Sequence, residues 1–240
     1  MPPGPDLPPG EVHLWRFPLQ GRSDRFALWN CLNDAERRQA EGYYRPEHGE
    51  RFASGRGVLR TLVAGYLQQR PQDVAFTTGR WGKPEVASST GLQLSFNLSH
   101  CEAWGVAAFA RQGQVGIDIE RVRHLPDAMS IARRQFSPAE FEWLAAADTS
   151  RQAEVFFRIW TRKEAVLKAV GAGLSIDLRG FSVTAVQGSG ELHALSLGGE
   201  SPLTDWRWLE FEAVPGYASC LVRDCAIAAV QAWEFGGDTA

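Results

Sequence analysis

The apolar and polar positions over residues 156–174 follow the period of an amphipathic helix. The apolar positions that share one stripe, at about 100° per residue, are Val155, Ile159, Val166 and Val170. Trp160, Glu164 and Lys168 follow at intervals of four residues on a roughly opposite face. Gly171 predicts the end of the helix. An indole, a carboxylate and an ammonium on the side away from the core favour a functional face over a plain surface helix.

The pattern before this helix predicts one strand, a set of helices and then a run of short strands. The expected helices cover residues 24–31, 34–41 and 47–69. The expected strands cover residues 12–17, 74–78, 94–98, 104–110 and 115–120. Residues 121–130 have no clear period and are expected to link two halves of the chain.

The pattern after this link again places helices before strands. Ser137, Pro138 and Glu140 form a capping-box sequence with proline at the first helical position, which predicts a helix start. The expected strands cover residues 181–186, 191–195, 206–212, 218–222 and 225–230. Helices followed by an antiparallel meander, repeated once, are typical of the α+β class rather than of alternating βαβ units.

This order predicts an α+β, pseudo-dimeric fold of two subdomains, each a long helix packed on an antiparallel sheet. We expect a disordered tail over residues 1–10, an N-terminal subdomain over residues 11–120 and a C-terminal subdomain over residues 121–235. The two subdomains would form one unit, with the functional site in the cleft between them. We expect a monomer, because one chain would then supply both sides of the cleft.

Composition and charge are those of an ordinary soluble protein. The 240 residues are 44% hydrophobic and 22% charged, and the formal net charge of −3 gives no reason to expect nucleic acid or an anionic membrane as partner. No apolar run reaches the length of a transmembrane helix, and the Pro/Gly-rich N-terminus does not resemble a secretory signal. The cysteines are Cys31, Cys101, Cys220 and Cys225. Their spacing does not fit zinc, and we expect reduced thiols in a cytoplasmic protein.

The sequence VGIDIERV is expected to form a strand with two unlike faces. Ile117 and Ile119 would point one way and Asp118 and Glu120 the other, because side chains alternate along a strand. One interpretation of the two carboxylates is a solvated strand face. The other is a hard-cation site, because Mg²⁺ takes carboxylate oxygens, waters and substrate phosphates. Glu164 of the predicted helix would then be a third acidic ligand.

The sequence FNLSHC ends an apolar strand with Ser99 and His100. A serine-hydrolase site is rejected, because no G-x-S-x-G motif surrounds Ser99 and adjacent strand residues point to opposite faces. A hydroxyl, backbone N–H groups and an imidazole at a strand end can instead hold a phosphate. A buried histidine with satisfied hydrogen bonds is the alternative for His100. The turn at residues 80–84 carries two cations and an indole and is by itself typical of a surface turn.

Four stretches together resemble a known family. They are RWGKP at residues 80–84, FNLSH at 96–100, GIDIE at 116–120 and WTRKEAVLKAVGAGL at 160–174. In this order and spacing they resemble the 4′-phosphopantetheinyl transferases of the surfactin-synthetase-activating type, in the subgroup that carries the W/KEA motif. Each stretch is a weak signal alone, and their order is a strong one.

The resemblance implies that coenzyme A is the co-substrate and that a serine of an apo carrier protein attacks its β-phosphate. The phosphopantetheine arm would be transferred to the carrier, and 3′,5′-ADP would leave. By matching position, Asp118, Glu120 and Glu164 would bind Mg²⁺, for which Mn²⁺ is an alternative. Glu164 would also be the base for the carrier serine. Lys168 would sit on the phosphates, and Lys163 would support this catalytic arrangement.

The resemblance also implies a set of contacts to coenzyme A: Arg51, Lys83, Pro84, Ser99, His100 and Lys168. Arg51 is expected to contact the 3′-phosphate. Family members often carry further basic residues for this phosphate in the first helical region, where this chain has ERRQ at residues 36–39. Cys101 stands where a small serine or another polar residue is common.

Two other classes of function remain as alternatives to the transferase. One is a non-catalytic protein of the same fold that binds coenzyme A or a carrier protein. Such a protein would be free to lose a metal ligand or Lys168, and this chain keeps them all. The other is a metal-dependent hydrolase of nucleotide pyrophosphates, which would release phosphopantetheine from coenzyme A without a carrier protein.

Overall fold

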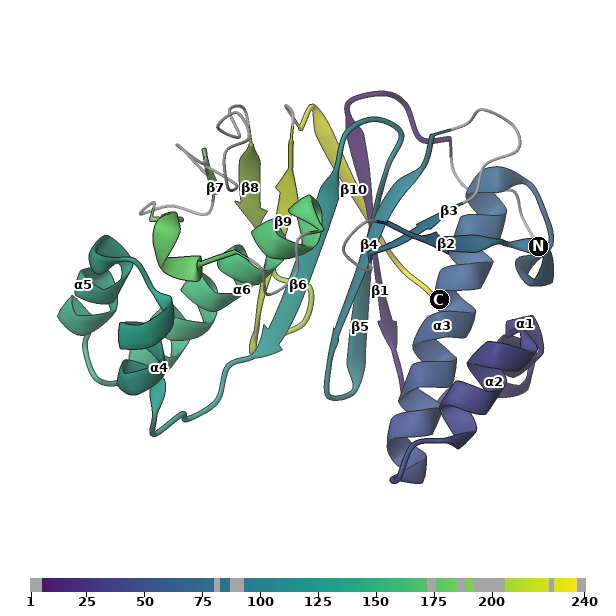
Figure 1. The fold of residues 1–240 in the computed structure, drawn as a ribbon, viewed down its shortest axis with the longest axis horizontal. Helices are drawn as coiled ribbons and strands as arrows, with labels where there is room; N and C mark the ends of the chain where they lie inside the picture. The colour runs from purple at the N-terminus through teal and green to yellow at the C-terminus, as the bar shows by residue number, and fades with distance from the viewer. Residues whose placement is uncertain are drawn as a thin grey trace.

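The computed structural model describes residues 6–79, 83–86, 93–171, 176–184, 189–191, 206–224 and 227–236. Its helices are α1 (Arg25–Cys31), α2 (Asp34–Glu41), α3 (Pro46–Leu67), α4 (Ala128–Gln135), α5 (Pro138–Ala146) and α6 (Gln152–Val170), with 3₁₀ turns η1 (Pro71–Asp73) and η3 (Leu178–Gly180). The strands lie in the middle of the molecule, with α1, α2 and α3 on one side and α4, α5 and α6 on the other (Figure 1). The chain therefore has an α+β fold.

The strands form two larger sheets and a small ribbon. They are β1 (Glu11–Pro18), β2 (Phe76–Thr78), β3 (Pro84–Val86), β4 (Ser95–Cys101), β5 (Trp104–Ala110), β6 (Val115–Arg121), β7 (Ser189–Glu191), β8 (Arg207–Glu210), β9 (Tyr217–Arg223) and β10 (Ala229–Glu234). One sheet has the order β10-β1-β5-β4, the other has the order β6-β9-β8-β7, and β2 pairs with β3. The last strand, β10, pairs in parallel with β1, so it returns to the first sheet.

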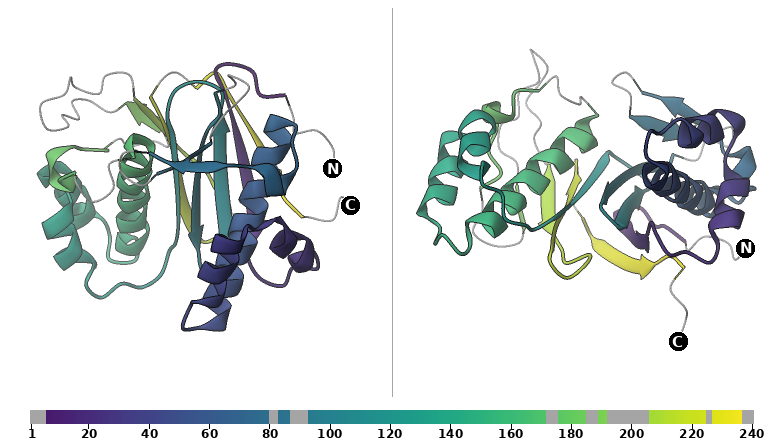
Figure 2. Two further views of the ribbon diagram at one scale, coloured as in Figure 1. Left: turned by 45° about the vertical axis from the view of Figure 1, so that its right-hand side comes forward. Right: turned by 90° about the horizontal axis from the view of Figure 1, so that it is seen from below.

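Each larger sheet carries one long helix, and the two sheets pack on each other. Alternate residues of β6, including Ile117 and Ile119, form a buried cluster with Val12 and Leu14 of β1 and Val106 of β5. Seen from below, the two groups of helices stand on opposite sides of the strands (right-hand view of Figure 2). The apolar alternation of β6 therefore joins the two sheets, while its acidic face turns toward α6.

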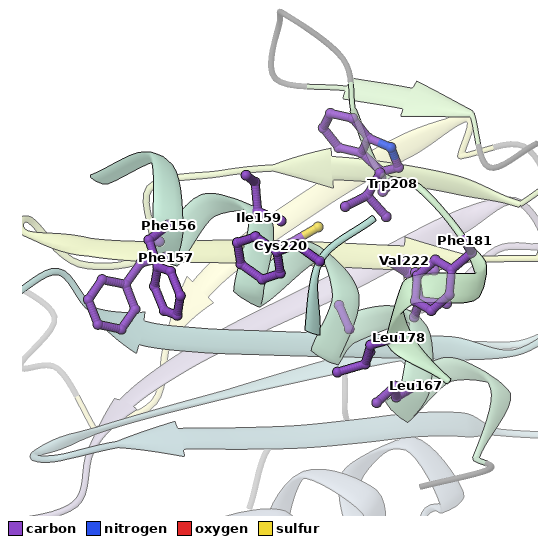
Figure 3. Close-up of a cluster of buried hydrophobic side chains, with 14 of the residues drawn as sticks. Phe156, Phe157, Ile159, Leu167, Leu178, Phe181, Trp208, Cys220 and Val222 are labelled. Atoms are coloured by element: carbon purple, nitrogen blue, oxygen red, sulfur yellow. The ribbon is translucent and has the colours of Figure 1, made fainter. Parts of the chain in front are cut away.

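Helix α6 packs its apolar stripe onto the second sheet. Phe156 and Ile159 of α6 lie in one buried cluster with Trp208 of β8 and with Cys220 and Val222 of β9 (Figure 3). On the opposite side of the molecule, α3 packs on the first sheet in a second cluster. Among the described residues, no helix is both long and apolar enough to cross a membrane.

Most local patterns led to the expected elements, with some exceptions. Helix α4 begins inside the expected link, at Ala128, and was not predicted. Strand β3 was not predicted either, and β10 covers residues 229–234 rather than the expected 225–230. The strand expected over residues 181–186 is wrong for its described part, because residues 181–184 are not in a strand. Side chains from neighbouring helices take the hydrogen bonds there: Arg162 donates to the Val183 carbonyl, and the Val183 N–H donates to Glu140.

The N-terminal stretch also carries a buried contact. Leu7 lies within the expected disordered tail over residues 1–10, yet it is only 2% exposed and belongs to the core beneath α3. Among the described cysteines, Cys31, Cys101 and Cys220 are free thiols, as expected. Cys225, residues 80–82 of the RWGKP stretch and residues 192–195 of an expected strand lie outside the described residues.

Gly116 permits the close approach of α6 to β6. A Cβ atom at this position would overlap the Ala165 carbonyl oxygen and the Ala169 backbone nitrogen. We therefore expect Gly116→Ala to lower the free energy of unfolding by about 1–3 kcal/mol, the usual cost of overpacking. Urea denaturation would measure this. Gly180→Ala is the matched control, since no described residue lies within 4 Å of its Cβ position, and equal stability of the two variants would contradict this role of Gly116.

Candidate active site

The polar face of β4 reaches the acidic strand β6, although the two strands belong to different sheets. The Asn97 side-chain oxygen accepts a hydrogen bond from the Ile117 N–H at 2.9 Å. Two residues further along β4, the Ser99 hydroxyl donates to Asp118 Oδ1 at 2.8 Å. Residues two apart on a strand share a face, so β4 holds β6 by a row of side chains rather than by backbone pairing.

Asp118 is the most buried carboxylate of the site, with 3% of its surface exposed. Lys168 of α6 donates to Asp118 Oδ1 at 2.6 Å and to the Ser99 hydroxyl at 2.8 Å. The other carboxylate oxygen, Oδ2, is buried and has no hydrogen-bond partner among the described residues. A buried oxygen of this kind is costly unless it gains a partner, and a bound cation is one partner that fits.

Glu120 of β6 and Glu164 of α6 stand near Asp118. Burial raises the pKa of Glu120, and the neighbouring Asp118 carboxylate raises it further. Burial also raises the pKa of Glu164; Asp118 and Glu120 add to this effect, and Lys168 opposes it. The three predicted ligands are thus brought close enough to repel one another, and a divalent cation would relieve this repulsion. Within the described residues, no three His, Cys, Asp or Glu side chains already form a group that could hold a metal ion.

A cavity of about 490 Å³ is lined in part by Asn97 and His100 of β4, the strand that also carries Ser99. Its lining includes Arg51 and Arg56 of α3, Pro84 of β3 and His100 of β4. His100 is exposed on one side, but the protein around its ring lowers its pKa, and Lys168 and Arg51 lower it further. Arg51 and Arg56, the two arginines in this lining, make the cavity suited to a phosphorylated ligand.

The ERRQ segment at residues 36–39 does not line this cavity. Glu36 of this segment is buried and accepts a hydrogen bond from Arg60 at 2.6 Å, while also closing the capping box of α2 with Asn33. It is therefore committed to the fold. Besides Arg51, Arg56 of α3 lines the cavity, and it also forms an ion pair with Glu36 at 3.5 Å.

Lys83 does not line the cavity with Pro84. Its ammonium donates to the Val115 carbonyl at 2.9 Å and to the Ala169 carbonyl at 3.1 Å. Burial lowers the pKa of Lys83 to about 8, and the nearby Glu85 carboxylate opposes this shift. These contacts tie β3 to the start of β6 and to the last turn of α6, behind the carboxylate cluster.

Lys163 is not brought to the cluster either, and its contacts are with Glu140 and two backbone carbonyls. It is fully buried, forms an ion pair with Glu140 at 2.8 Å and donates to the carbonyls of Leu178 and Phe181 at 2.6 and 2.9 Å. Adjacent residues of a helix do not share a face. Lys163 therefore points away from Glu164 and fixes the segment after α6.

Replacing Lys163 by methionine should destabilise the fold without affecting the chemistry. Glu140 would remain as an unpaired buried charge, a change that typically costs about 3–5 kcal/mol. The double variant Lys163→Met/Glu140→Gln should recover part of this loss in urea denaturation. It should also modify its substrate at the wild-type rate per folded molecule. A folded double variant without activity would contradict the structural role.

The sequence analysis gave no role to Asn97 or Cys101. Cys101 donates to Glu120 Oε2 at 3.3 Å, so it continues the row that Asn97 and Ser99 begin. The period-two spacing of these three residues on one predicted strand was a usable signal. Their target could not be predicted, because β4 and β6 are not hydrogen-bonded neighbours in a sheet.

Comparison with known proteins identifies the family. The model of the 4′-phosphopantetheinyl transferase superfamily matches residues 114–222. The chain is 41% identical over 176 residues to the 4′-phosphopantetheinyl transferase HetI of a Nostoc species. The matched region covers 72% of this chain and 74% of the relative. It is 32% identical over 172 residues to the 4′-phosphopantetheinyl transferase Sfp of Bacillus subtilis, and this match also covers 72% of this chain and 74% of the relative. The chain belongs to the 4′-phosphopantetheinyl transferase superfamily, which confirms the resemblance seen in the sequence.

Proposed function

We propose that this chain transfers the 4′-phosphopantetheine arm of coenzyme A to a serine of an apo acyl, peptidyl or aryl carrier protein and releases 3′,5′-ADP. The observation that carries the proposal is the arrangement around Asp118, where Ser99 and Lys168 donate to one carboxylate oxygen and the other has no hydrogen-bond partner among the described residues. Glu120 and Glu164 stand beside it, and the cation-lined cavity is formed in part by the strand that carries Ser99.

The donor set fits a divalent cation, and we assign Asp118, Glu120 and Glu164 to Mg²⁺ or Mn²⁺. Hard cations prefer carboxylate oxygens, and the partnerless Asp118 Oδ2 supports this choice. When bound, the ion would neutralise charge on the non-bridging oxygens of the pyrophosphate. Lys168, which donates to the other oxygen of this carboxylate, Oδ1, would contact the phosphate oxygens.

The cavity residues are proposed to hold coenzyme A. Arg51 and His100 would bind its phosphates, with Arg51 on the 3′-phosphate, and Pro84 would pack against the nucleotide. Ser99 would orient Lys168, to which it is hydrogen-bonded. Lys83 would act through the backbone of β6 and α6 that it contacts.

Transfer then needs a base for the carrier serine, and we assign Glu164. The proton of the serine hydroxyl would pass to a Glu164 carboxylate oxygen, directly or through one water, while the serine oxygen attacks the β-phosphorus. The bond between this phosphorus and the bridging oxygen breaks, and 3′,5′-ADP leaves with its charge stabilised by Lys168.

The two-subdomain organisation is also a proposal. We propose that the halves divide near residue 120 and are related by a pseudo-twofold axis, with the site between them. The pair of long helices, α3 over one sheet and α6 over the other, supports this division. Two strands cross the boundary: β6 lies in the second sheet, and β10 returns to the first. We further propose a cytoplasmic monomer that contacts its carrier through the basic segment at residues 121–134.

The proposal is tested by the products released from coenzyme A. With an apo carrier protein and Mg²⁺, chromatography should detect 3′,5′-ADP in an amount equal to the carrier modified. Without a carrier, neither 3′,5′-ADP nor free phosphopantetheine should form. Release of both without a carrier would favour the pyrophosphate hydrolase instead.

A further inference from the structure

Cys101, the last residue of β4, bridges two groups at the end of β6. Its thiol donates to Glu120 Oε2 at 3.3 Å, within hydrogen-bond range for sulfur. The same sulfur accepts the backbone N–H of Arg121 at 3.4 Å. The backbone of β6 therefore fixes the thiol, and the thiol in turn holds the side chain of Glu120.

The contact repeats the arrangement two residues earlier on the same strand. There the Ser99 hydroxyl holds Asp118, as the Cys101 thiol holds Glu120. Both donors lie on one face of β4, and both acceptors lie on one face of β6. One face of β4 thus orients Asp118 and Glu120, two of the acidic residues proposed to bind the cation.

Glu120 needs such a contact more than an isolated carboxylate would. It is half-buried, and the Asp118 carboxylate lies near enough to repel it. Without a cation, repulsion would drive its side chain away from Asp118. Arg123 also faces Glu120 and, as an exposed cation two residues beyond Arg121, would attract it outward.

We propose that Cys101 is a positioning residue for the metal site, and that its thiol holds one oxygen of Glu120 so that the other is available as a cation ligand. This inference rests on the proposed function of the carboxylate cluster. Hydrogen-bond partners of metal ligands typically change metal affinity by about 10–100-fold when removed. Since the thiol is a weak donor, we expect an effect of about 10-fold, at the lower end of this range.

The test measures metal binding without turnover. Mn²⁺ is titrated into metal-free protein in the absence of coenzyme A, and the free ion is followed by electron paramagnetic resonance. Cys101→Ala should weaken Mn²⁺ binding about 10-fold, and Cys101→Ser should restore it because the hydroxyl can donate to Glu120. Cys31→Ala is the matched control, because this buried thiol lies in α1 and donates to the Ala27 carbonyl.

Each outcome is decisive. Mn²⁺ affinity in Cys101→Ala equal to that of the wild type would overturn the proposal, as would equal weakening in Cys101→Ala and Cys101→Ser. Failure of the wild type to bind Mn²⁺ would overturn the metal site of the proposed function, and the inference with it. Should Cys101→Ala not fold, Cys101→Val fills the same space without a donor and carries the same expectation. In Cys101→Ala, a raised KM for Mg²⁺ with kcat recovered at saturating Mg²⁺ would show that the thiol positions the metal site and that the fold is intact.

Discussion

Replacing Glu164 by alanine is expected to abolish carrier modification while leaving the protein folded. Glu164 of α6 lies near Asp118 and Glu120, and it is both a proposed ligand and the proposed base. Loss of a group that stabilises the transition state at this point should lower kcat by roughly 10³-fold or more. The free energy of unfolding should not fall, because the change removes one of three mutually repelling carboxylates.

The matched control is Glu154→Ala on the same helix. Glu154 lies ten residues earlier, where its carboxylate reaches Arg151 at 3.5 Å and Arg158 at 3.9 Å on the surface. A pair of this kind contributes about 0–1 kcal/mol, so neither activity nor stability should change appreciably. Carrier modification by Glu164→Ala at the wild-type rate would remove Glu164 from the mechanism.

Replacing Lys168 by methionine is expected to affect both rate and stability. The rate of transfer should fall by about 10²–10³-fold, the usual effect of losing one donor that stabilises developing charge. The metal-free protein should also lose about 3 kcal/mol of stability, because Asp118 would remain buried without its charge partner. The pair is close, with 2.6 Å between Lys168 Nζ and Asp118 Oδ1.

This second effect can be tested independently of the reaction. Urea denaturation of metal-free Lys168→Met should show this loss of stability. Mg²⁺ should offset the loss more than it stabilises the wild type, since the Lys168 ammonium no longer opposes binding of the cation. Adding Asp118→Asn should recover stability but not activity. Equal stability of Lys168→Met and wild type without metal would contradict the role given to the ion pair.

The local patterns of the sequence were enough to place the proposed carboxylate cluster. The helical period of α6 and the alternation of β6 put Glu164, Asp118 and Glu120 on facing surfaces, and the glycine at position 116 allowed the two elements to approach. The order of the family motifs along the chain then indicated that these elements contribute to one site. These side chains could be placed from the pattern because burial of an apolar stripe determines which face of each element remains for polar groups.

What the sequence could not predict are contacts between elements far apart in the chain. Lys163 sits in the same motif as Glu164, yet its partner is Glu140 of α5. Lys83 bonds to backbone carbonyls of β6 and α6, and backbone acceptors leave no trace in residue type. The parallel pairing of β10 with β1 likewise depends on the whole fold rather than on any local period.

The most direct test of the proposed function is the intact mass of an apo carrier protein after incubation with this protein, coenzyme A and Mg²⁺. The account predicts a gain equal to one phosphopantetheine arm, located on the carrier serine and lost when EDTA is added. No gain with fatty-acid, polyketide and peptide carriers, despite measurable coenzyme A binding, would contradict it and favour a non-catalytic binding protein.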